Sequence, residues 1–211
     1  MKIKTFTFNP FQENTFIVYD DSKAAAIIDA GCFNAEEEKL IDEFIQSENL
    51  KPEYLINTHC HIDHVAGLSA LKSKYNVPFL AHKDDSFLLD TAVEQGKVFG
   101  FGIEPPPSIN SFIDEPQEIK IGNSRLQVYH VPGHSPGSVA LYAPEGEFVI
   151  VGDVLFSGSI GRTDLPGGDY KTLISSITEK LMVLPGNTTV YPGHGPATTI
   201  KHEHDTNPFL T

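Results

Sequence analysis

The sequence is poor in cysteine, in basic residues and in long apolar runs, and each shortage excludes a class of protein. Its two cysteines, Cys32 and Cys60, are too few for a disulfide-stabilised scaffold. Its 15 basic residues face 28 acidic ones, so with a formal charge of −13 neither nucleic acid nor an anionic membrane surface is an expected partner. No apolar run approaches the roughly 18 residues of a membrane span, and the first residues lack the apolar core of a signal peptide. We therefore expect a cytoplasmic protein.

Length and composition indicate one globular domain. The 211 residues sit at the upper end of a single domain and are few for two, so one domain over residues 1–211 is expected. Hydrophobic residues make up 40% and charged residues 20%, which is close to the globular norm and excludes a disordered or fibrous chain.

Strand signals precede helix signals in both halves of the chain. In the first half, the patterns predict strands over 2–8, 14–20, 24–29, 54–57 and 79–81, and helices over 34–48, around Leu68–Tyr75 and over 84–95. In the second half, they predict strands over 118–121, 125–131, 139–142, 148–151 and 189–191, and a helix over 170–183. This order favours the α/β class, with two sheets packed face to face and helices outside, a four-layer αββα sandwich.

The densest group of reactive side chains lies in Thr58–His64, with the sequence THCHIDH. In a turn that leaves a strand, His59 and His61 can point the same way and hold one ion. At the start of the following helix, Asp63 and His64 can face a second. Imidazole and carboxylate ligands suit zinc, with iron or manganese as alternatives. A lone histidine is more often structural, but four such residues in six positions favour a metal site, and Cys60 between them is interpreted as a packing residue.

Three later residues of ligand type also follow strands, each in a turn rich in glycine or proline. His134 lies in VPGHSPGS, Asp153 ends the apolar run FVIVG, and His194 lies in YPGHGP. With the first group they make seven potential ligands, the number needed for two metal ions that share one bridging carboxylate.

These motifs, THCHIDH, VPGHSPGS, GDVLF and YPGHGP in this order, resemble those of the metallo-β-lactamase superfamily and, within it, the glyoxalase II-like (hydroxyacylglutathione hydrolase-like) enzymes. Residues 161–169 and 206–210 look like its short, single-domain bacterial branch. The resemblance implies the αββα fold and two divalent metal ions. One is held by His59, His61 and His134, the other by Asp63, His64 and His194, and Asp153 bridges them.

The same resemblance implies a metal-dependent hydrolase that cleaves a small-molecule thioester with a metal-bridging hydroxide. Asp63 is the candidate catalytic residue, since it can orient the hydroxide and accept its proton. Family members place a lysine near Arg162 and a tyrosine near Asp164. Arg162 can anchor a substrate carboxylate bidentately, whereas Asp164 cannot replace a phenol. We also expect the glutathione-binding helical domain of full-length glyoxalase II to be missing, and substrate preference to be relaxed.

Rival functions are open at this point. A persulfide dioxygenase of the same superfamily would use one iron on His59, His134 and Asp153. A lactonase or another ester hydrolase would use the same hydroxide. A β-lactamase is disfavoured, because those with two zincs usually carry a cysteine where Asp153 stands. A non-catalytic metal-binding module would close the open coordination position with protein, and no feature of the sequence suggests that.

Overall fold

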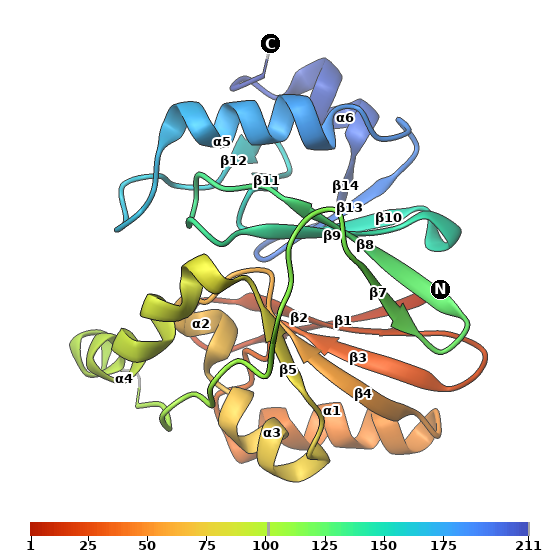
Figure 1. Cartoon of the computed structure of the whole chain (residues 1–211), viewed down its shortest axis with the longest axis vertical. Helices are drawn as coiled ribbons and strands as arrows, with labels where there is room; N and C mark the ends of the chain where they lie inside the picture. The colour runs from red at the N-terminus through yellow and green to blue at the C-terminus, as the bar shows by residue number, and fades with distance from the viewer. Residues whose placement is uncertain (101, 211) are drawn as a thin grey trace.

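Two sheets packed face to face form the centre of the molecule in the residues that the structure describes, 1–100 and 102–210 (Figure 1). This computed structural model gives each sheet six strands. The first sheet has the order β1 (Lys2–Phe8), β2 (Glu13–Tyr19), β3 (Ala24–Ile28), β4 (Lys51–Ile56), β5 (Phe79–Ala81) and β6 (Ser111–Phe112). The second has the order β14 (Thr198–Thr199), β13 (Thr189–Pro192), β10 (Phe148–Gly152), β9 (Val139–Ala143), β8 (Ser124–His130) and β7 (Glu118–Ile121). A separate short ribbon pairs β11 (Leu155–Phe156) with β12 (Ser159–Ile160).

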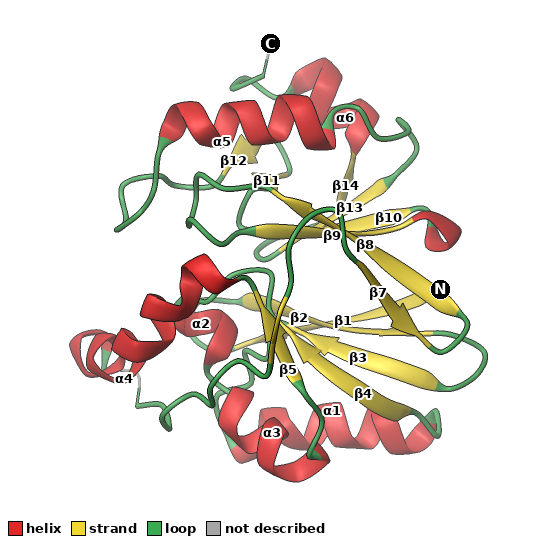
Figure 2. Ribbon diagram, in the orientation of Figure 1, coloured by secondary structure: helices red, strands yellow, loops and turns green. Residues whose placement is uncertain are grey.

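Helices cover the outer face of each sheet (Figure 2). The first sheet is covered by α1 (Ala35–Ser47) and α3 (Leu68–Tyr75). The second is covered by α5 (Tyr170–Ser176), which continues as the π-helical turn η3 (Ile177–Leu181), and by α6 (Ile200–Thr206). At one end of the sandwich lie α2 (Ile62–Val65) and α4 (Ser86–Phe99), the latter after the 3₁₀ turn η1 (Lys83–Asp85). The predicted α/β four-layer αββα sandwich is confirmed.

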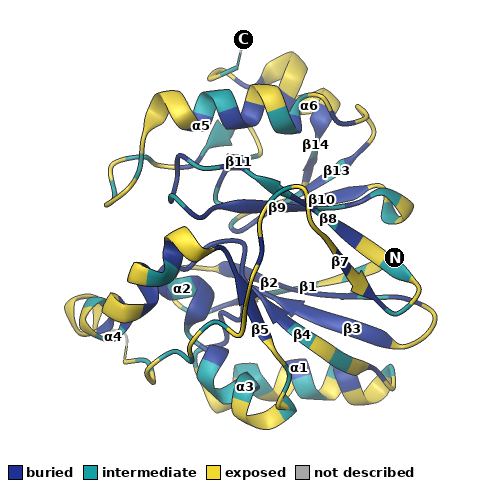
Figure 3. Cartoon of the chain, in the orientation of Figure 1, coloured by how far each residue is buried: buried dark blue, intermediate teal, exposed yellow. Residues whose placement is uncertain are grey.

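Strand β2 illustrates how one sequence fills two cores. Phe16 and Val18 belong to the apolar cluster between the sheets, whereas Ile17 belongs to the cluster beneath α1. Successive side chains of a strand point to opposite faces of the sheet, so a run of apolar residues is what a strand between two layers needs. Figure 3 shows the result, with strands buried and the outer faces of the helices exposed. A third cluster lies between the second sheet and α5.

The predicted element boundaries agree with the structure to within a few residues. Asn34 is the N-cap of α1, and its side chain accepts a hydrogen bond from the Glu37 backbone N–H. The helix expected over 84–95 begins later, at Ser86, and runs on to Phe99. The two-residue strands β6, β11, β12 and β14, which are too short to show an alternating pattern, and the short helix α6 were not predicted from the sequence. Among the described residues, no helix is both long and apolar enough to cross a membrane.

Strand directions bring the ligand-bearing loops to one edge. In the first sheet, β3 and β4 run parallel, so the residues after both strands meet at the same end. In the second sheet, β10 and β13 run parallel, and β8 shares their direction because β9 pairs antiparallel with both β8 and β10. The carboxyl ends of these five strands therefore gather the loops that carry the predicted ligands.

Candidate metal centre

The loop after β4 carries four of the predicted ligands and is held from within by Asn57. The buried Nδ2 of Asn57 donates to the carbonyl oxygens of His59, at 3.2 Å, and of His64, at 2.8 Å. These two bonds tie the start of the loop and the short helix α2, to which His64 belongs, to the same amide. The short helix then turns His64 and Asp63 toward the same space as the two preceding histidines.

Three histidines form the first group of ligand atoms. His59, His61 and His134 each place one ring nitrogen within 4.8 Å of a ring nitrogen of the other two. Nδ1 of His61 lies 2.8 Å from Nε2 of His134. Burial, reinforced by the neighbouring His134, lowers the pKa of His61 to about 4. Burial also lowers the pKa of His59. At neutral pH both imidazoles are therefore uncharged, which is the form that binds a metal ion.

Asp63, His64 and His194 form the second group. The Asp63 Oδ2 lies 3.1 Å from Nε2 of His194 and 3.8 Å from Nε2 of His64. Burial alone would raise the pKa of Asp63, but the charge of His64 and the hydrogen bond with His194 outweigh it and hold the pKa well below its usual value. Burial would lower the pKa of His64, and the carboxylates of Asp63 and Asp153 raise it well above its usual value.

Asp153 lies between the two groups. Its Oδ1 is 3.5 Å from Nε2 of His64, and its Oδ2 is 3.7 Å from Nε2 of His134 and 3.5 Å from Nε2 of His194. A Cβ on Gly193 would lie 2.2 Å from the Asp153 Oδ1, so the Pro-Gly-His turn needs glycine to let this carboxylate in.

Backbone carbonyls fix the ring orientation of two histidines. Nδ1 of His134 lies 2.8 Å from the carbonyl oxygen of Arg162, and Nδ1 of His194 lies 3.0 Å from that of Phe11. An imidazole that donates from Nδ1 to a carbonyl leaves the lone pair on Nε2. In both residues Nε2 is the ring nitrogen that faces Asp153.

Two buried carboxyl groups behind His64 were missed by the sequence analysis. The Asp29 Oδ2 lies 3.2 Å from Nδ1 of His64, and the same carboxylate accepts hydrogen bonds from the backbone N–H and hydroxyl of Thr58. Glu13 is fully buried 3.7 Å from Nδ1 of His64, and burial raises its pKa. Asp29 could have been predicted from the sequence, because it follows the apolar run of residues 24–28 just as Asp153 follows the apolar strand before it.

Asp85 is a third residue that the sequence analysis missed. It is buried, and it accepts hydrogen bonds from the backbone N–H of Cys60 at 3.0 Å, from that of Gly137 at 2.6 Å and from the hydroxyl of Ser135 at 2.8 Å. The first partner belongs to the loop of His59 and His61, and the other two to the loop of His134. One carboxylate thus ties together the two loops that supply the first ligand group.

The donor set fits metal ions. Among the described residues, the buried Nε2 atoms of His59 and His64 and the Oδ1 of Asp153 have no hydrogen-bond partner. Leaving such an atom buried and unpaired costs about 1–3 kcal/mol each, and a cation bound between them would remove that cost. Nitrogen and carboxylate donors match zinc and iron.

A cavity of about 280 Å³ opens over these ligands. Its polar lining includes Arg162, whose guanidinium is exposed and bound to Asp164 through Nε and Nη2, at 2.7 and 2.8 Å. Its apolar lining is formed by Phe11, Ile62, Phe99 and Leu165.

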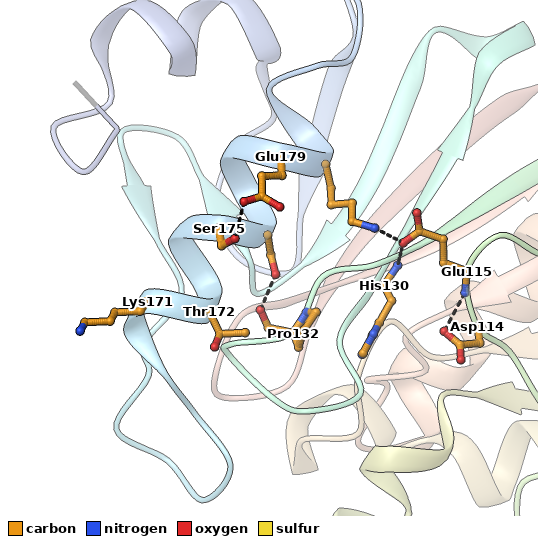
Figure 4. Close-up of a pocket in the computed structure, with 10 residues that line it drawn as sticks. Asp114, Glu115, His130, Pro132, Lys171, Thr172, Ser175 and Glu179 are labelled. Atoms are coloured by element: carbon orange, nitrogen blue, oxygen red, sulfur yellow. Dashed lines mark hydrogen bonds and ion pairs between the residues drawn. The ribbon is translucent and has the colours of Figure 1, made fainter.

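A larger cavity, of about 630 Å³, lies beside α5 and the end of β8 (Figure 4). None of the seven predicted ligands lines it, and several of its polar groups bind one another. Lys180 is paired with Glu115, and the Ser175 hydroxyl donates to Glu179. The smaller cavity is therefore the better candidate for a reaction site.

Comparison with known proteins agrees with this geometry. The sequence model described as the metallo-beta-lactamase superfamily matches residues 8–194. The chain is 39% identical to the hydroxyacylglutathione hydrolase GloC of Haemophilus influenzae, over all of this chain and 98% of that protein. Among solved structures, TTHA1623 in a di-iron-bound form is 40% identical, with a TM-score of 0.88 over 98% of this chain and 100% of that one. The BLEG-1 B3 metallo-beta-lactamase is 36% identical, with a TM-score of 0.91 over the whole of both chains. The chain belongs to the metallo-β-lactamase superfamily.

Proposed function

We propose that the protein is a dinuclear metallohydrolase that cleaves small thioesters, of the glyoxalase II (hydroxyacylglutathione hydrolase) type, within a single domain. The observation that carries the proposal is the position of Asp153 between two groups of three ligands, with its oxygens 3.5–3.7 Å from nitrogens of both. The identity to GloC supports the thioester substrate.

His59, His61 and His134 would hold one ion, Asp63, His64 and His194 the other, and Asp153 both. Two divalent cations bound there would lower the pKa of a water toward ~7 and polarise an acyl oxygen. Zinc is the first expectation from the ligand set. The di-iron form of TTHA1623 supports iron as the next, ahead of manganese.

Asp63 is the proposed proton acceptor. Its side chain is about one-eighth exposed at the floor of the cavity, and its low pKa keeps it ionised at neutral pH. The contact with His194 orients its Oδ2. Because a thiolate leaves as an anion, cleavage of a thioester needs no separate acid, which suits a cavity that offers carboxylates rather than carboxylic acids.

Hydrolysis of a thioester panel tests the proposal. Protein reconstituted with zinc should hydrolyse S-D-lactoylglutathione and the lactoyl thioester of N-acetylcysteamine, and treatment with a chelator should abolish both activities. Metal-loaded protein that leaves every thioester intact would overturn the assignment.

The resemblance to BLEG-1 makes β-lactam hydrolysis a second candidate. A chromogenic cephalosporin added to the panel distinguishes the two, because the proposal expects its kcat/KM to fall far below that of the thioesters. Oxygen uptake with glutathione persulfide tests the dioxygenase alternative, which the assembled group of Asp63, His64 and His194 disfavours, since a mononuclear site does not need it.

We also propose a cytoplasmic location. Both cysteines, Cys32 and Cys60, are buried free thiols, as is usual in a reducing compartment.

A further inference from the structure

Arg162 is the one lysine or arginine among the described residues that line the cavity over the candidate metal centre. It is also the residue to which the sequence analysis assigned a substrate carboxylate. A guanidinium binds a carboxylate best through two parallel N–H donors. Whether Arg162 can do so depends on what its donors already bind.

In the structure, the Nε–Nη2 edge of the Arg162 guanidinium is occupied from within the same loop. Arg162 Nε donates to the Asp164 Oδ1 at 2.7 Å, and Nη2 donates to the Asp164 Oδ2 at 2.8 Å. The hydrogen bonds from Arg162 lower the pKa of Asp164 to about 2, so the carboxylate is ionised at neutral pH. A substrate carboxylate would have to displace Asp164 to reach the same two donors.

Among the described residues, the rest of the cavity wall holds no second lysine or arginine, and Gln95 is the one side-chain amide in it. Phe11 and Phe99 meet edge to face, with ring centroids 6.0 Å apart, and Ile62 and Leu165 complete an apolar lining. The carboxylates of Asp63 and Asp153 line the floor. With the Nε–Nη2 edge of the Arg162 guanidinium bound to Asp164, whose charge offsets its own, an apolar and uncharged substrate tail suits this wall better than one that carries carboxylates.

We infer that Asp164 is a specificity-determining residue, which by occupying Arg162 favours thioesters with a neutral thiol portion over those of glutathione. The inference rests on the proposed thioester hydrolysis and names its substrate class. No chemical step depends on Asp164. Its substitution should therefore change the ranking of substrates.

The test compares two substrates with the same acyl group, lactoylglutathione and lactoyl-N-acetylcysteamine, in zinc-loaded protein. The wild type should prefer the neutral thioester. Asp164→Asn should raise the ratio of kcat/KM for the anionic to the neutral substrate about fivefold, the upper end for an exposed ion pair. Asp205→Asn is the matched control, since it removes one charge from an exposed pair with Lys201 that lines no part of the cavity; it should leave the ratio unchanged.

A binding measurement separates this inference from the proposed function, because it needs no turnover. By calorimetry, S-hexylglutathione, a thioether that cannot be hydrolysed as a thioester, should bind the Asp164→Asn variant about fivefold more tightly than the wild type. In an Arg162→Ala background, the same change at Asp164 should have no effect. An unchanged affinity, or an equal gain without Arg162, would overturn the inference. Failure of every thioester to react would refute only the proposed function.

Discussion

The molecule contains two clusters of histidine and aspartate at the same end of the sandwich, and their differences indicate which of them suits a metal ion better. The first is the candidate metal centre. The second, here called the rim cluster, consists of His82, Asp114 and His130, which also bring ligand atoms within 4.8 Å of one another. By residue type and spacing alone, both qualify.

Ring orientation separates the two clusters. In the candidate centre, the rings of His61 and His134 lie at 83° to each other, whereas in the rim cluster those of His82 and His130 are stacked, 11° from parallel and 4.2 Å apart. The lone pair of an imidazole lies in the plane of its ring. Two stacked rings therefore hold their lone pairs in separate parallel planes, whereas the planes of two crossed rings intersect and both lone pairs can point to one metal ion.

The hydrogen bonds behind the rings also differ. In the rim cluster, Nδ1 of His82 accepts from the Asp84 N–H at 3.2 Å, and Nε2 of His130 lies 2.8 Å from the carbonyl oxygen of Pro136. The partner of His82 leaves its proton on Nε2, the atom that faces Asp114 at 3.4 Å. In the candidate centre, His134 and His194 meet their backbone carbonyl partners through Nδ1, so that in the neutral ring the lone pair is on Nε2, which faces Asp153. Ring orientation and supporting contacts, more than the number of ligands, therefore make the candidate metal centre the better fit to a metal ion.

The largest expected difference between the clusters is in the effect of replacing an aspartate by alanine. Asp153→Ala should lower metal content and reduce thioester hydrolysis by more than about a hundredfold, which exceeds the usual cost of losing a residue that only supports a ligand. Asp114→Ala should leave both within about twofold. Metal analysis and initial rates measure the contrast, and normal turnover in Asp153→Ala would refute the bridging role.

A smaller loss of metal affinity is expected from Asp29→Asn, which weakens the contact behind His64 without removing a predicted ligand. The amide keeps the size of the side chain but loses the charge that faces Nδ1 of His64. Metal affinity should fall about 10–100-fold, as measured by competition with a chromogenic chelator. An unchanged affinity would mean that the carboxylate behind His64 does not tune the site.

Asp85→Asn should affect stability more than chemistry. One of the three donors that the carboxylate satisfies would face an amide NH₂ instead of an oxygen. We expect a loss of about 1–3 kcal/mol in the free energy of unfolding, measured in urea with the metal-loaded protein. Unaltered stability would show that the tie between the two ligand loops is dispensable.

The smallest effect concerns the rim cluster and pH. Burial, with the neighbouring His130, lowers the pKa of His82 in the folded protein below that of the unfolded chain. The stability that this difference represents is present above pH 6.5, the ordinary histidine value, and is lost as the pH falls below it. His82→Asn should flatten the dependence of unfolding free energy on pH between about 7.5 and 5.5. His202→Asn, which replaces an exposed histidine, should leave that pH dependence unchanged. Equal slopes in the wild type and in both variants would contradict the lowered pKa of His82.

The sequence predicted the fold and singled out candidate ligands that the structure brings together, because both depend on local patterns. Apolar runs mark the strands, and residues such as His134 and Asp153 stand directly after them. It could not predict Asp85 or Glu13, because their partners lie far away in sequence, on loops that only the packing of the two sheets brings near. It assigned Arg162 to a substrate carboxylate, whereas the structure pairs Arg162 with Asp164, a contact that depends on the shape of one loop.

The most direct test of the central claim is the number of metal ions per chain. Protein stripped of metal, reconstituted with excess zinc and freed of unbound ions by gel filtration should contain two zinc ions per chain by mass spectrometry of the elements. Fully active protein with one ion per chain would contradict the dinuclear centre and the bridging position of Asp153.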